Sequence, residues 1–122
     1  NDPLLKVWQN EAYKTFYYHS AHLHYFTEES LLEVATKSGV DINKVNFEYT
    51  QDYNLLNHLN WLSNDMPQDD CHVGLSDINI KTVGSNISEW LNDELILLNE
   101  SYIKRLKHLK ATSNIMMIIT ND

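Results

Sequence analysis

The sequence has little glycine, proline or cysteine: three Gly, two Pro and one Cys among 122 residues. Folds with many short strands need more turn-forming residues than this, so an all-β sandwich or barrel is not expected. The single cysteine, Cys71, cannot form an internal disulfide. A scaffold held together by disulfides is therefore excluded.

Long apolar runs and positive charge are also scarce. No apolar run reaches the roughly 18–20 residues of a membrane span, and we predict no membrane insertion. Nine Lys and Arg residues stand against seventeen Asp and Glu residues, which gives a net charge of −8. Nucleic-acid binding gains affinity when Lys and Arg displace counterions from phosphates, so this charge weighs against a nucleic-acid partner. It favours a basic protein partner.

The hydrophobic content is that of a folded protein. Hydrophobic residues make up 43 % of the chain, and its length is usual for one domain, so we expect a single helical domain over residues 1–122. No targeting signal assigns a compartment, and a soluble cytoplasmic protein is the default expectation. The missing initiator Met is what a processed chain or an excised domain would show. The sequence does not determine the oligomeric state.

The spacing of apolar residues predicts an all-α bundle of about four helices. Asp2 is a candidate N-cap, and Thr27 is another, followed by acidic residues that suit a helix start. Gly39 suits the position just after a helix end. The helices are expected near residues 3–26, 28–38, 42–63 and 86–112.

Two stretches fall outside this pattern. Residues 64–85 form a long irregular loop between the third and fourth expected helices, and this loop contains Cys71 and His72. Residues 115–119 (IMMII) are too short to span a membrane. The run is a last buried turn, an edge strand or a contact patch, and the sequence leaves these three possibilities open.

Histidines and the cysteine offer a possible metal site. His19 and His22 lie three residues apart and would share one helix face. His58, or Cys71 with His72, would complete a site whose imidazole and thiolate ligands suit zinc. No recognised metal or haem motif is present, so we expect no cofactor and keep a His-based metal or cofactor sensor as an alternative. A hydrogen-bonded core histidine is the other explanation for His19.

Residues 31–45 resemble a DNA-binding helix-turn-helix. The positions that pack two short helices around a turn are filled suitably by Ala35, Gly39, Val40 and Val45. This resemblance implies a fragment of a transcriptional regulator. Its recognition helix would present Asn43, Lys44 and Asn46. The alternative is a purely structural corner between two helices, which the scarcity of Lys and Arg favours.

Few residue patterns in the sequence indicate catalysis. A thiol and an imidazole stand side by side at Cys71 and His72, but adjacent residues seldom point at one another and no third orienting group can be named. No glycine-rich phosphate loop and no G-x-S-x-G motif is present. The sequence therefore favours a protein that is not an enzyme.

An acidic chain with many aromatic residues suits a binding surface, because aromatic side chains supply contact area and carboxylates steer a basic partner. We expect a non-enzymatic interaction module, such as an inhibitor or immunity-type neutraliser of a basic protein. The alternative is that the tyrosines only complete the core. The candidate partner-binding residues are Tyr17, Tyr18, His22, Tyr25, Glu28 and Glu29.

Overall fold

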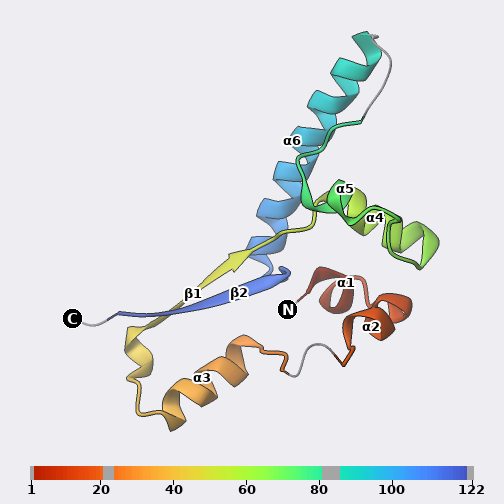
Figure 1. The fold of residues 1–122 in the computed structure, drawn as a ribbon. Coiled ribbons are helices and arrows are strands. Elements are labelled where there is room, and N and C mark those ends of the chain that lie inside the picture. Colours follow the sequence, from red (N-terminus) through yellow and green to blue (C-terminus); the bar gives the residue numbers. More distant parts are fainter. Residues whose placement is uncertain (1, 21–23, 81–85, 121–122) are drawn as a thin grey trace.

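The computed structural model describes residues 2–20, 24–80 and 86–120, and it contains both helices and a sheet (Figure 1). The expected all-α bundle of four helices is therefore wrong. The elements in chain order are α1 (Pro3–Lys6), α2 (Glu11–Tyr17), α3 (Glu28–Lys37), the 3₁₀ helix η1 (Ile42–Lys44), β1 (Val45–Thr50), α4 (Leu55–Asn64), α5 (Cys71–Leu75), α6 (Asn86–His108) and β2 (Asn114–Ile119).

The single helix expected over residues 3–26 is replaced by α1 and α2. Asp2 caps α1 as predicted, since its Oδ1 accepts the Leu4 N–H at 2.8 Å. The helix ends early, and Gln9 adopts a positive φ of 50° that a continuing helix does not allow. A new helix then begins at Asn10, whose Oδ1 accepts the Tyr13 N–H at 2.6 Å.

Helix α3 agrees with the prediction to within one residue. Thr27 is its N-cap, and the Thr27 and Ser30 side chains each accept a hydrogen bond from the other residue's backbone N–H. Gly39 follows the helix with φ +78°, the left-handed conformation that glycine adopts most easily. The predicted start and end of this helix are confirmed.

The helix expected over residues 42–63 is divided into η1, β1 and α4. The new start is Asn54, whose Oδ1 accepts the Asn57 N–H at 3.1 Å. Its side-chain amide also donates to the carbonyls of Val73 and Ser76, at 2.7 and 3.0 Å. The helix-turn-helix interpretation needs a second helix after Gly39, and the chain forms only one 3₁₀ turn and a strand there.

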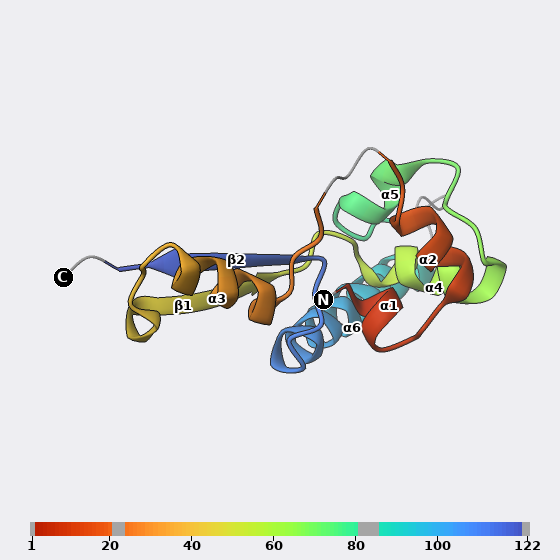
Figure 2. The same ribbon diagram turned by 90° about the horizontal axis from the view of Figure 1, so that it is seen from below.

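The 115–119 run belongs to β2, which pairs with β1 in an antiparallel two-stranded ribbon. Opposite residues share a face, so Phe47 and Tyr49 of β1 lie on the same side as Met117 and Ile115 of β2. Helix α3 lies beside the ribbon (Figures 1 and 2). Within residues 64–85, the short helix α5 interrupts the loop that we expected to be irregular.

The core is small, and the molecule is elongated (Figure 2). Leu4, Tyr13 and Trp61 form a buried cluster where α1, α2 and α4 meet. Helix α6 begins where predicted and ends four residues earlier than predicted, and it projects away from the other elements (Figure 1). Among the described residues of α6, only Leu106 is fully buried.

Candidate functional site: an aromatic and acidic cleft

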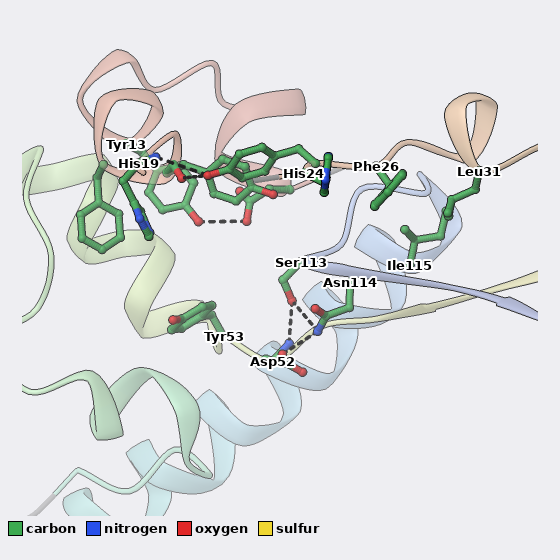
Figure 3. Close-up of a pocket in the computed structure, with 14 residues that line it drawn as sticks. Tyr13, His19, His24, Phe26, Leu31, Asp52, Tyr53, Ser113, Asn114 and Ile115 are labelled. Atoms are coloured by element: carbon green, nitrogen blue, oxygen red, sulfur yellow. Dashed lines mark hydrogen bonds between the residues drawn. The ribbon is translucent and has the colours of Figure 1, made fainter. Parts of the chain in front are cut away.

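A cleft of about 500 Å³ lies between the N-terminal helices and the end of the ribbon nearest to them (Figure 3). One wall is built from aromatic rings of α2 and of the chain that leads to α3. The opposite wall comes from the segment just after β1 and from the start of β2. The rings that line the cleft are those of Tyr13, Phe16, Tyr17, Tyr25, Phe26 and Tyr53.

The aromatic wall is held together by its own contacts. The Tyr17 ring lies 5.6 Å from the Tyr13 ring and 5.0 Å from the Tyr25 ring, measured between centroids. The Tyr25 hydroxyl donates to the backbone carbonyl of Tyr17 at 2.7 Å. These contacts fix the Tyr25 side chain against α2, although it comes from the segment after that helix.

A buried carboxylate lies beneath the aromatic wall. Asp2 is only 3 % exposed, and its Oδ2 accepts a hydrogen bond from the Tyr13 hydroxyl at 3.0 Å. Burial raises the pKa of Asp2, while the bond from Tyr13 acts in the opposite direction. Burial also raises the pKa of Tyr13, and the nearby Asp2 carboxyl raises it further. The tyrosine therefore stays protonated and remains a donor to Asp2.

A second carboxylate lies on the opposite wall and is exposed to solvent. Asp52 follows β1, and its Oδ2 accepts a hydrogen bond from the Asn114 side-chain amide at 2.5 Å. The Asp52 backbone N–H donates to Ser113 Oγ at 3.0 Å (Figure 3). The pairing of β1 with β2 thus places this carboxylate opposite the aromatic rings.

Two of the predicted partner-binding tyrosines, Tyr17 and Tyr25, line the cleft. Tyr18 does not line it and lies in a neighbouring hollow that Tyr17 and Tyr25 share. The Tyr18 ring is 53 % exposed and lies 4.9 Å from the Tyr25 ring. His22, the fourth aromatic candidate, lies outside the residues that the structure describes.

The two predicted acidic residues lie on α3 in different surroundings. Glu28 forms an ion pair with Lys110, with Nζ 2.9 Å from Oε2 and 3.1 Å from Oε1, and it also accepts a hydrogen bond from the Tyr49 hydroxyl. The bond from Tyr49, and then the bond from Lys110, lower the pKa of Glu28. Glu28 thus connects α3 to the ribbon, whereas Glu29 is exposed.

Among the described residues, the predicted metal ligands His19 and His58 belong to no group with metal-ligand spacing. His58 is 1 % exposed, and its Nδ1 lies 2.6 Å from the Tyr102 hydroxyl, which is the environment of a core histidine. His19 lines the aromatic cleft instead.

Cys71 and His72 are exposed and lie with Asp70 at the start of α5. Their candidate ligand atoms and that of Asp70 lie within 4.8 Å of one another, and Asp70 Oδ1 already accepts the His72 N–H. Within the described parts of the chain, this is the one group of three or more His, Cys, Asp or Glu residues with metal-ligand spacing. It contains neither His19 nor His58.

Sequence reasoning missed the polar half of the cleft. Asp2 was recognised as a helix cap, but nothing in its neighbourhood indicated that Tyr13 would bond to it. Asp52 and Asn114 meet only because their strands pair, with Thr50 opposite Asn114. No local pattern at either residue contains that information.

The cleft has the chemistry of a cation-binding site. Aromatic faces attract positive charge, the Asp52 carboxylate is exposed on one wall, and the Asp2 carboxylate lies buried beneath the other. Among the fourteen described residues that line the cleft there is no Lys or Arg. A cation that enters would therefore meet aromatic rings and negative charge, with no resident Lys or Arg to compete.

Comparison of the chain with protein-family models, with curated proteins and with solved structures finds no match. Within the described residues, no helix has both the length and the apolar character needed to cross a membrane.

Proposed function

We propose that this protein is a non-enzymatic interaction module for a basic protein partner, and that the aromatic cleft receives a Lys or Arg side chain of that partner. The observation that carries the proposal is the composition of the cleft: six aromatic rings and the carboxylates of Asp2 and Asp52, without Lys or Arg in the lining.

The charge of the cleft and of the whole chain favours a basic side chain over an apolar one. A cation over an aromatic face gains about 0.5–2 kcal/mol, depending on how far it is desolvated. The exposed carboxylate of Asp52 adds direct attraction, and the net charge of −8 raises the rate of encounter with a basic protein. A volume of about 500 Å³ falls in the range of sites that enclose small organic groups. An inhibitor or immunity-type neutraliser of a basic protein is the biological role we propose for such a surface.

The proposal is tested with fluorescein-labelled twelve-residue peptides, one rich in Lys and Arg and one rich in Asp and Glu. We expect the basic peptide to bind and the acidic one not to bind in fluorescence anisotropy at low salt. Asp52→Asn is expected to weaken binding of the basic peptide about fivefold or more, because it removes the exposed carboxylate.

Asp41→Asn is the matched control, since it removes the same charge from an exposed residue that does not line the cleft. This variant should change the affinity less than twofold. Equal weakening by both variants would show that only net charge matters, and that outcome would overturn the cleft as the binding site.

A further inference from the structure

Helix α6 has an apolar face that no described part of the chain covers. Four large side chains on this face are at least half exposed: Ile87 at 72 %, Trp90 at 59 %, Leu97 at 61 % and Leu98 at 54 %. At 3.6 residues per turn their positions fall on one side of the helix. We call these four residues the outer face of α6.

A different side of α6, about 120° around the helix from the outer face, makes contacts with the rest of the molecule. Asn99 Oδ1 accepts the Leu55 N–H at 2.8 Å, and the Tyr102 hydroxyl lies 2.6 Å from His58 Nδ1. The outer face therefore points away from the body of the protein. A partner could approach it without displacing α4.

The total accessible surface is larger than a compact chain of this size exposes. It is 8711 Å², whereas a folded monomer of 14.3 kDa exposes about 6,800 Å². The excess of about 1,900 Å² is more than the roughly 800 Å² per partner that a standard interface buries. Covering the outer face by association would bring the exposed surface toward the usual value.

Charges along α6 are segregated by sign. The acidic residues come first, and the basic residues follow in the last two turns. The helix dipole favours this order only within the first and last turn, and Asp93, Glu94 and Glu100 lie beyond the first. Among the described residues, none of these side chains takes part in an ion pair within the chain. The acidic residues are Glu89, Asp93, Glu94 and Glu100, and the basic ones are Lys104, Arg105 and Lys107.

We propose that the outer face of α6 binds the same face of a second copy of this chain, with the two helices antiparallel. In this orientation the acidic half of each helix lies against the basic half of the other. A parallel pair would place like charges together. A two-fold pair also uses the same apolar patch on both copies, so the outer face of each copy is buried by the outer face of the other.

The charges also indicate the register of the pair. Placing Glu94 opposite Lys104 of the second copy, and Asp93 opposite Arg105, puts the two-fold axis at the level of Asn99. The two copies of Leu98 then lie on either side of this axis, about 3 Å apart along the helices. The two copies of Ile87 lie about 36 Å apart at opposite ends of the contact, at 1.5 Å of rise per residue.

The first test is the molar mass of the full chain in sedimentation equilibrium, with variants that place a charge on α6. We expect a dimer for the unmodified chain and at least a tenfold higher dissociation constant for Leu97→Glu. Ile96→Glu is the control, because Ile96 is 39 % exposed and lies 100° away around the helix. It should leave the dimer intact.

Circular dichroism of both variants checks that α6 still forms. A monomeric unmodified chain at 200 µM would overturn the proposal. Equal weakening by Leu97→Glu and Ile96→Glu would do the same, since the outer face would then have no special role.

The second test is oxidative cross-linking in a Cys71→Ser background. Leu98→Cys should form a disulfide-linked dimer, because residue 98 lies one residue from the axis and the two sulfurs come within the short reach of a disulfide. Ile87→Cys should remain uncross-linked. Cross-linking at both positions would indicate parallel helices and would contradict the antiparallel arrangement.

Discussion

His58 sits in one of the least accessible places in the molecule. Its side chain lies between Gln51 and Tyr102, and the Trp8 indole N–H donates to the Tyr102 hydroxyl at 3.3 Å. Burial lowers the pKa of His58 from 6.5 to about 4, so the ring is neutral in the folded protein at pH 7.

This histidine predicts that the protein loses stability in mild acid. The unfolded chain takes up a proton near pH 6.5, whereas the folded protein resists protonation until about pH 4. Above pH 6.5 the neutral histidine does not reduce the free energy of unfolding. Between pH 6.5 and about 4 that free energy falls, because only the unfolded chain takes up the proton. We expect the free energy of unfolding to decrease by about 2 kcal/mol between pH 7 and pH 5.

Urea denaturation of His58→Gln at both pH values checks the assignment. The variant should be less stable at pH 7 and should show a smaller difference between the two pH values. His108→Gln, which alters an exposed histidine, should keep the full difference. A full pH difference in His58→Gln would contradict the prediction.

The bond between Tyr13 and Asp2 gives a second prediction at the scale of one residue. Tyr13→Phe removes the hydroxyl that donates to Asp2 Oδ2 and leaves a buried carboxylate oxygen without this partner. We expect a loss of about 1–3 kcal/mol in urea denaturation at pH 7. Tyr18→Phe, at an exposed tyrosine, should change stability by less than about 0.5 kcal/mol.

At the scale of elements, the sequence predicted α3 and α6 well because both have a single apolar period without competing signals. The 45–50 segment has two competing apolar periods. Val45, Phe47 and Tyr49 alternate with polar residues, as in a strand, but Val45 and Tyr49 also fit a helical spacing that continues into α4. Pairing with β2, more than 60 residues later, decides in favour of the strand.

The N-terminal helix was predicted too long for a related reason. Its apolar stripe continues in register from α1 into α2, and the interruption at Gln9 carries no glycine or proline. Asn10 provides the N-cap of the second helix, but asparagine is too common in this chain to stand out. For the site, the tyrosines were predictable from composition, whereas Asp52 and Asn114 depend on the sheet.

The contact between α4 and α5 predicts the effect of a glycine substitution. A Cβ at Gly74 would lie 2.8 Å from Asn57 Cβ, which is too close for real atoms. Gly74→Ala should therefore push α5 away from α4 and cost about 1–3 kcal/mol.

Gly39→Ala provides the comparison, because a Cβ there meets nothing within 4 Å. The loss of stability then comes only from the backbone angle φ of +78°, which alanine adopts less easily than glycine. We expect about 1 kcal/mol for it. A thermal melt that ranks Gly39→Ala as the more damaging change would show that α4 and α5 are not packed as described.

At the scale of the whole molecule, a small core and a large exposed apolar surface occur together. A dimer formed through α6 would link folding to association, because ligands that bind only the folded state stabilise it. We therefore expect the midpoint of thermal unfolding to rise with protein concentration between about 2 and 200 µM. The midpoint for Leu97→Glu should depend less on concentration, and an unchanged midpoint for the unmodified chain would contradict this coupling.

The proposed ligand of the cleft is a cationic side chain of a protein partner. The most direct measurement is a titration of the ¹⁵N-labelled chain with the Lys- and Arg-rich peptide, followed by amide chemical shifts. We expect the largest changes around the cleft, at Tyr13, Tyr53 and Asn114. Changes centred on the acidic part of α6, or scattered over all acidic surfaces, would contradict it.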